Sequence, residues 1–84
     1  MDEIKNLRIQ GFHFNPNMTS EVNSIYYDSN ECEDDWIEII PDSISKESYV
    51  VVIVIGGVTV KVFAEKNDAN YINESINSLL EDLL

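Results

Sequence analysis

The side chains that could take part in chemistry are an acidic run, one histidine and one cysteine. The run holds seven acids and no basic residue between Asp28 and Asp42, and Ca²⁺ prefers such oxygen ligands. A calcium loop also needs an oxygen ligand, a turn glycine and a closing glutamate at fixed positions, which here hold Cys32, Glu33 and Ile39. A zinc site would need more than one histidine and one cysteine. We therefore expect no bound metal.

Neither His13 nor Cys32 points to catalysis. Nucleophilic catalysis needs a nucleophile, a base and an orienting group that meet in space. Serines and acids are plentiful, so a serine–histidine–aspartate site stays open, but a structural or exposed strand histidine is the simpler interpretation of His13. Cys32 has acidic neighbours on both sides, which disfavour the reactive thiolate. We expect that the protein is not an enzyme and that it has no cofactor.

The charge of the chain is strongly negative and unevenly spread. Five basic residues stand against sixteen acids, and the net charge is -11. Residues 28–47 include eight of the acids and only one lysine, so most of the net charge lies there. Such a field attracts basic partners and repels nucleic acid and anionic lipid. We expect a basic protein as partner, and no direct contact with nucleic acid or with a membrane.

Length and composition predict one folded domain over residues 1–84. A chain of 84 residues leaves no room for a second core, and 44% hydrophobic residues argue against disorder. The single cysteine allows no internal disulfide. The N-terminus lacks a secretory signal, and the longest apolar run, Tyr49–Ile55, is too short to cross a bilayer. We therefore expect a cytoplasmic protein.

The second half of the chain has the clearest secondary-structure pattern. Two β-branched runs, 49–55 and 58–63, flank Gly56 and Gly57, a pattern typical of a β-hairpin with a two-residue turn. The first run is apolar on both faces, which predicts a central strand. Apolar residues then recur every three or four positions over 69–83. This spacing predicts an amphipathic helix that packs on the apolar face of the hairpin.

The first half predicts three more strands. Residues 7–14 alternate in polarity, and a bulge at Gly11 would keep their apolar side chains on one face. Residues 15–20 have the composition of a turn, 21–27 form the second expected strand, and 36–40 form the third, which ends at Pro41. The expected fold is α+β, with an antiparallel meander of about five strands packed on one C-terminal helix.

The acidic run is the candidate binding site, because aromatic residues flank it. Tyrosine and tryptophan are common anchors in protein interfaces. In an extended segment alternate residues lie about 6.6–6.8 Å apart, close to two of the ~3.4 Å charge steps of one DNA strand. We expect these residues to contact the partner: Asp28, Glu31, Glu33, Asp34, Asp35, Glu38, Asp42, Tyr27 and Trp36. Two alternatives stay open, namely that the run is only a solvated surface and that the aromatic residues pack in the core.

In size and charge the chain is similar to phage-encoded inhibitors that mimic DNA, including uracil-DNA glycosylase inhibitors and small anti-CRISPR proteins. The likeness implies a small acidic inhibitor of the anti-CRISPR or anti-restriction type, which binds the basic nucleic-acid-binding surface of an enzyme such as a nuclease. Immunity proteins that neutralise nuclease toxins are also small, acidic and cytoplasmic, and are an alternative. A third alternative is a non-catalytic interaction subunit or a homodimeric structural protein.

Overall fold

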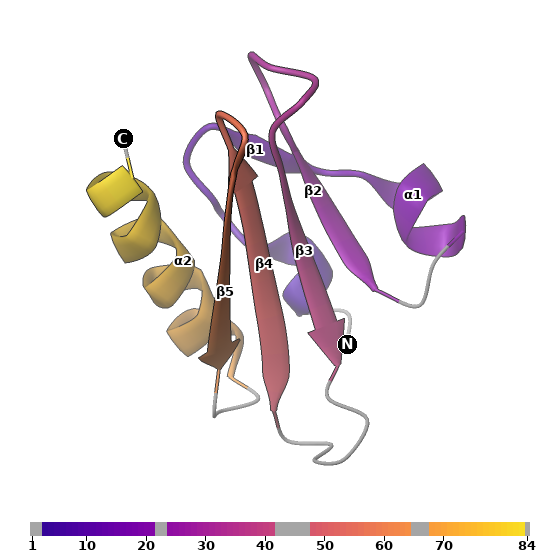
Figure 1. The fold of residues 1–84 in the computed structure, drawn as a ribbon. Coiled ribbons are helices and arrows are strands. Elements are labelled where there is room, and N and C mark those ends of the chain that lie inside the picture. The colour runs from indigo at the N-terminus through magenta and orange to yellow at the C-terminus, as the bar shows by residue number, and fades with distance from the viewer. Residues whose placement is uncertain (1–2, 22–23, 42–47, 65–67, 84) are drawn as a thin grey trace.

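The fold is one antiparallel sheet in which each strand pairs with the next along the chain (Figure 1). The structure is a computed structural model, and it describes residues 3–21, 24–41, 48–64 and 68–83. The strands are β1 (Phe12–Phe14), β2 (Ile25–Ser29), β3 (Trp36–Pro41), β4 (Tyr49–Ile55) and β5 (Val58–Ala64). The helix α2 (Ala69–Leu83) follows them. The predicted α+β class, with five antiparallel strands and a C-terminal helix, is confirmed.

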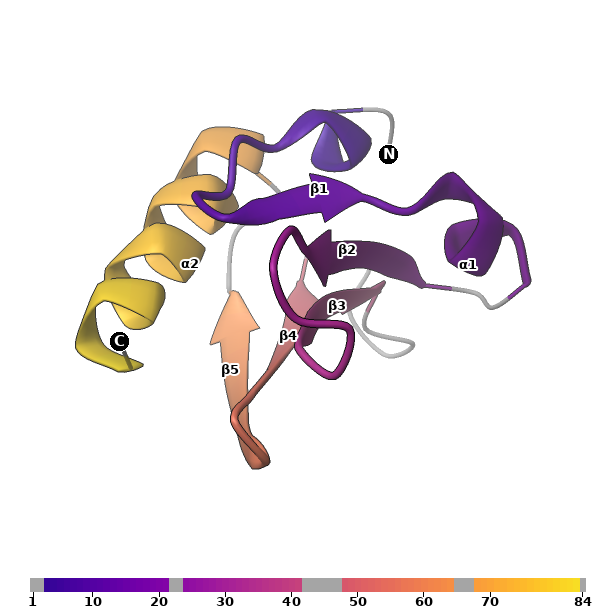
Figure 2. The same ribbon diagram turned by 90° about the horizontal axis from the view of Figure 1, so that it is seen from above.

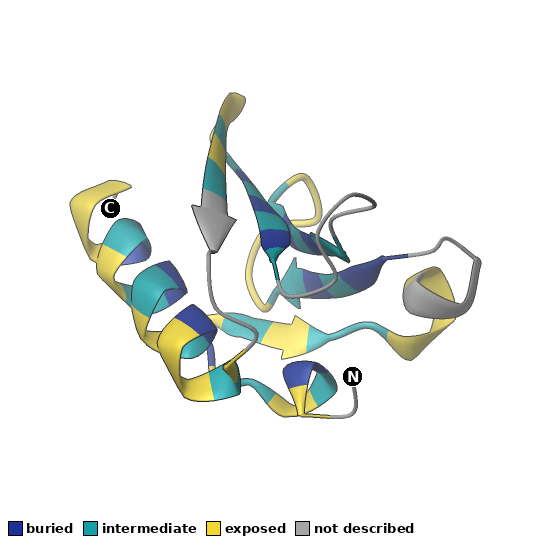
Figure 3. Ribbon diagram, turned by 90° about the horizontal axis from the view of Figure 1, so that it is seen from below, coloured by how far each residue is buried: buried dark blue, intermediate teal, exposed yellow. Residues whose placement is uncertain are grey.

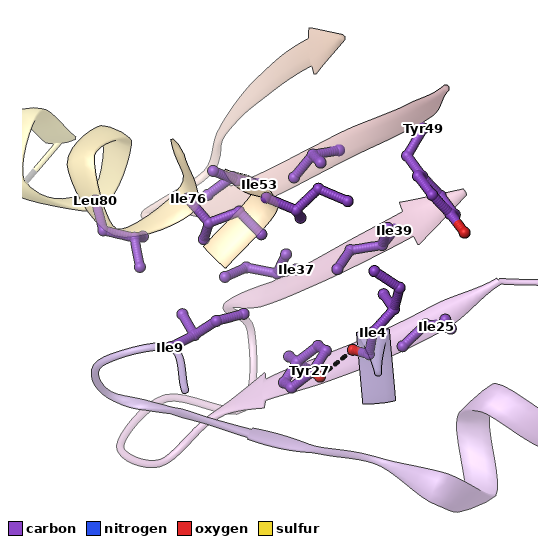
Figure 4. Close-up of a cluster of buried hydrophobic side chains, with 12 residues drawn as sticks. Ile4, Ile9, Ile25, Tyr27, Ile37, Ile39, Tyr49, Ile53, Ile76 and Leu80 are labelled. Carbon is purple, nitrogen blue, oxygen red and sulfur yellow. Dashed lines mark hydrogen bonds between the residues drawn. The ribbon is translucent and has the colours of Figure 1, made fainter. Parts of the chain in front are cut away.

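One face of the sheet is covered, and the hydrophobic core lies beneath that cover. Figure 2 shows α2 along one side of the curved sheet, near the N-terminal segment that begins with the 3-10 helix η1 (Ile4–Asn6). The helix buries Ile72, Ile76 and Leu80, which share one stripe because they are four residues apart. In Figure 4 the side chains of η1 and α2 meet those of the middle strands in one cluster, which includes Ile4, Ile9, Ile37, Ile39, Ile53, Ile76 and Leu80.

The strands β4 and β5 are joined by Gly56 and Gly57. Both glycines have positive φ values, 58° and 81°, which are the left-handed conformations that a tight two-residue turn requires. Ile55 lies opposite Val58, and the pairing continues without a shift to Tyr49 opposite Ala64. The strand β4 also pairs with β3 on its other side, so it is a central strand.

The predicted strand over residues 7–14 is only partly correct, because β1 begins at Phe12. Gly11, with φ 85°, is not a bulge but the third residue of a turn that the Phe12 N–H closes onto the Ile9 carbonyl at 3.1 Å. The backbone of Arg8 and Gln10 bonds to side chains of α2 instead of to the backbone of a strand. The Arg8 N–H donates to Asn73 Oδ1 at 2.6 Å, and the helix residue Asn77 also bonds to this backbone.

A short helix, α1 (Pro16–Glu21), occupies most of the segment that we expected to be a turn. Asn15 Oδ1 accepts from the Met18 N–H at 3.0 Å, which is the hydrogen bond of a helix N-cap. Pro16 then takes the first helical position, where a backbone N–H makes no hydrogen bond within the helix, so the lack of this group in proline costs nothing. The next strand therefore starts at Ile25 and runs to Ser29, a few residues later than predicted.

Candidate protein-binding face

Strand alternation places a second set of side chains on the opposite side of the sheet, which we call the open face. Along β3 and β4, buried and half-buried residues alternate (Figure 3). Every side chain of the open face that the structure describes is half-buried or exposed. These residues are His13, Tyr26, Asp28, Trp36, Glu38, Ile40, Val50, Val52, Val54, Thr59 and Lys61.

The open face has a polar half on β2 and β3 and an aliphatic half centred on the valines of β4, with Thr59 and Lys61 of β5 at its far edge. On β2 and β3, Asp28 lies opposite Trp36, and Tyr26 lies opposite Glu38. The neighbouring strand β4 contributes only valines to this face. The two carboxylates are therefore diagonal neighbours on adjacent strands, with Trp36 and Tyr26 at the other two corners. This square of two acids and two aromatic residues is the most chemically distinct part of the face.

Hydrogen bonds hold the carboxylates of the square in place. Glu38 Oε2 accepts from Ser24 Oγ at 2.8 Å, and Asp28 Oδ2 accepts from Asn15 Nδ2 at 2.5 Å. Burial raises the pKa of Tyr26, and its hydrogen bond to Glu38 and the charge of that carboxylate raise it further. The tyrosine therefore stays neutral. Both carboxylates of the square are anchored rather than free to rotate.

The acidic loop, residues 30–35, joins β2 to β3 at the end of the open face (Figure 1). The Asp35 N–H donates to the Cys32 carbonyl at 3.2 Å, so the chain turns here and is not extended. The expected DNA-like spacing of alternate residues therefore does not apply to Glu31, Glu33 and Asp35. Ser29 Oγ accepts from two N–H groups of the loop, at 3.2 Å each, which orders the loop backbone.

The predicted binding residues are distributed over this face and this loop. Asp28, Glu38 and Trp36 lie on the open face, and the side chains of Glu31, Glu33 and Asp34 are exposed on the loop. Asp35 is half-buried, and its Oδ1 accepts from the Gly56 N–H at 3.1 Å, so it ties the loop to the β4–β5 turn. Asp42 lies outside the described residues.

The prediction that Tyr27 contacts a partner is wrong. Its side chain is only 1% exposed and lies in the core, where its ring packs against Phe14 with centroids 5.8 Å apart. Its hydroxyl donates to the Ile4 carbonyl and accepts from the Leu7 N–H at 2.9 Å, so it fastens the N-terminal segment to the sheet. The alternative that aromatic residues pack in the core holds for Tyr27, whereas Trp36 is half-buried on the open face.

Tyr26 is the aromatic residue of the open face that the sequence-based selection missed. The alternation of Ile25 and Tyr27 with more polar neighbours was the available signal, because two apolar residues two positions apart share a strand face. That face is the core face, which leaves Tyr26 and Asp28 on the other side. Asn15 was also missed, because only the folded chain brings it to Asp28.

The two residues first considered for chemistry, His13 and Cys32, both lie at the surface. His13 is exposed, and its Nδ1 lies 2.6 Å from Asn30 Oδ1. Cys32 is an exposed free cysteine of the acidic loop. Within the described ranges, no three histidine, cysteine or acidic side chains gather in a way that could hold a metal ion.

Comparisons with known proteins return no relative for this chain. No family model matches it, and neither a curated protein nor a solved structure is significantly similar to it. Of the helices described, none has the length and apolar character needed to span a bilayer.

Proposed function

We propose that this protein is a small acidic cytoplasmic inhibitor that binds the basic nucleic-acid-binding surface of an enzyme and so acts as a DNA mimic. The observation that carries the proposal is the charge of residues 24–41, which contain six acids and no basic residue. Strands β2 and β3 and the loop between them bring all six to one end and one face of the sheet. The proposed binding surface is the acidic loop together with the polar half of the open face.

The spacing of anchored carboxylates supports mimicry of phosphates. Asp28 and Glu38 are diagonal neighbours on adjacent strands, and such positions lie about 7–8 Å apart. Two charge steps along one DNA strand span a similar distance, about 6.8 Å. A channel lined by lysine and arginine, built to neutralise phosphates, would meet carboxylates at comparable intervals. Because the sheet holds both strands, this spacing does not depend on the partner.

The aromatic residues of the same surface supply the apolar part of an interface. Trp36 and Tyr26 are half-buried, so their rings are partly available to a partner. Interfaces typically combine a few aromatic or arginine anchors with a polar rim. The acids of the loop would form that rim, and they would also speed association, because opposite charges steer two proteins together over the Debye length of about 8–10 Å.

The test is a competition between this protein and DNA for the same enzyme. The immobilised protein is exposed to a bacterial lysate at low salt, bound proteins are eluted with rising salt, and each eluted nucleic-acid enzyme is offered a DNA duplex with and without the inhibitor. We expect DNA and the inhibitor to exclude one another. A stable ternary complex of enzyme, DNA and inhibitor would contradict the proposal.

A matched pair of charge variants distinguishes the contribution of the acidic loop to binding from the contribution of the net charge. The double variant Glu31→Lys with Asp34→Lys changes the loop, and Glu74→Lys with Asp82→Lys changes exposed acids of α2 by the same net charge. We expect the loop variant to weaken binding at least ~100-fold and the helix variant to weaken it only a few-fold, since distant charges are screened. Equal losses in the two variants would show that only the net charge matters.

A further inference from the structure

A hollow of about 290 Å³ lies where α1 meets the polar half of the open face. Its walls come from α1 and the residue before it, from β2 and β3, and from the acidic loop. The residues that line it are Asn15, Met18, Tyr26, Asp28, Glu33 and Trp36. The α1 segment and the β2–β3 hairpin therefore converge on one small space.

The lining has an unusual chemical composition for so small a hollow. It combines two carboxylates, from Asp28 and Glu33, with two aromatic rings and contains no basic side chain. Carboxylates form paired hydrogen bonds with a planar guanidinium group, and tryptophan and tyrosine rings attract a cation that stacks on them. Lysine offers a compact ammonium group that gains less from a flat ring.

The lining is also held in position before any ligand arrives. Asn15 is fixed by three hydrogen bonds: its N–H donates to the Tyr26 carbonyl at 2.9 Å, its Oδ1 accepts from Met18 at 3.0 Å, and its Nδ2 donates to Asp28. This side chain therefore orients the Asp28 carboxylate. Strand pairing places Trp36 directly opposite Asp28, so a ring and a carboxylate stand side by side.

We infer that this hollow, which we call the arginine pocket, receives an arginine side chain of the partner protein. The hollow of about 290 Å³ lies at the lower end of the about 300–1,000 Å³ range of ligand pockets, which is room enough for one long side chain. The guanidinium group lies against Trp36 and is bonded by Asp28 and Glu33. This inference rests on the proposed function, because the arginine belongs to the basic surface that the protein covers.

The experiment uses Trp36, the only tryptophan of the chain, as the reporter. The whole protein is titrated with N-acetyl-arginine amide, with the lysine analogue and with the uncharged citrulline analogue, while tryptophan fluorescence is recorded. We expect saturable binding of the arginine probe, with the other two probes binding at least about tenfold more weakly. Equal responses to arginine and citrulline, or to arginine and lysine, would overturn the inference.

Variants locate the binding. Asp28→Asn should weaken binding of the arginine probe about tenfold. Glu33→Gln should weaken it by a similar factor, and this residue is exposed on the loop, so its substitution leaves the sheet untouched. Glu74→Gln on α2 removes the same charge away from the pocket and should leave the titration unchanged. Titrations of Glu33→Gln and Glu74→Gln that coincide would refute the pocket even if Asp28→Asn disturbed folding.

The two proposals fail in different ways. If the arginine pocket is wrong but the inhibitor function is right, the protein still excludes DNA from its enzyme while Glu33→Gln binds the probe as well as the parent protein does. If the pocket is right but the function is wrong, the probe binds selectively and no nucleic-acid enzyme is displaced from DNA.

Discussion

The covered face and the open face are built from alternate residues of the same strands, yet they differ in every physical respect. On β4, Val51 and Ile53 point into the core and are buried, whereas Val52 and Val54 on the open face are only half-buried. The covered face holds the Tyr27 phenol in place with two backbone bonds, and the open face holds carboxylates in place with neutral side chains.

This difference shows that apolar character alone does not decide which side of a strand is buried. Aliphatic side chains occupy both sides of β4, but α2 and the N-terminal segment cover only one of them (Figure 2). The covering layer turns one face into the core. The other face keeps half-buried valines beside its acids and aromatic rings.

The largest expected difference in stability is between two truncation variants, one on each face of β4. Ile53→Ala, at a side chain with no exposed surface, should lower the free energy of unfolding by about 2–5 kcal/mol. Val52→Ala, the adjacent residue on the open face, should lower it by about 1 kcal/mol or less. Urea unfolding followed by circular dichroism measures both. Equal losses would mean that the open face is buried after all.

The two adjacent tyrosines offer a smaller and sharper comparison. Tyr27→Phe removes the hydroxyl that bonds to Ile4 and Leu7, and it leaves the part-buried Leu7 N–H without this acceptor. The free energy of unfolding should therefore fall by about 1–3 kcal/mol. Tyr26→Phe removes a hydroxyl at a half-buried site and should change stability by less than about 1 kcal/mol. Thermal unfolding of both variants gives the ranking, and a larger loss for Tyr26→Phe would reverse our assignment of the faces.

Alkaline pH should weaken the fold through the same two residues. Burial raises the pKa of Tyr27, and its hydrogen bond with the Leu7 backbone lowers that pKa by a smaller amount. Burial also raises the pKa of Tyr26, and the neighbouring Glu38 raises it further. The native state therefore keeps these protons at a pH where the unfolded chain, with an ordinary value of 10.0, loses them. The contribution to stability is complete below pH 10 and declines as the pH rises beyond it.

Urea unfolding at a series of pH values from 8 to 11 tests this linkage. We expect a flat profile until the ordinary tyrosine range is reached, followed by a decline that is shallower in Tyr27→Phe, because that variant lacks one of the shifted groups. A decline of the same steepness in Tyr27→Phe and in the parent protein would exclude Tyr27 as a contributor.

The smallest expected effect is the response of stability to salt. Uncompensated acids repel one another, and raising the ionic strength from 0.01 to 0.15 M shortens the Debye length from about 30 Å to about 8 Å. The midpoint of thermal unfolding should therefore rise by a few degrees with salt. In Glu31→Lys with Asp34→Lys this gain should shrink, whereas Ile53→Ala should keep the full gain. A gain that is unchanged in the loop variant would show that the loop acids do not repel one another in the fold.

Some of the candidate site could be foreseen from the sequence. The acidic run between aromatic residues is visible in the order of the residues, and the strand before Pro41 was found by its composition. Between the adjacent aromatic residues Tyr26 and Tyr27, the alternation with Ile25 already favours Tyr27 as the core residue, and the pairing with β3 then places Tyr26 opposite Glu38. The contact of Asn15 with Asp28 depends on α1 reaching the open face, which no local pattern signals.

The sequence by itself determined the α+β class, the order of the strands and the negative charge, because periodicity, β-branched runs and charge are local properties. Tertiary structure alone decided three further matters. It bonded the backbone of Arg8 and Gln10 to the asparagines of α2 instead of to a strand, it covered one face of a strand that is apolar on both, and it brought the α1 segment and the β2–β3 hairpin around one hollow. Each depends on which distant groups compete for a backbone bond or a buried surface, and that competition is settled only when the whole chain has folded.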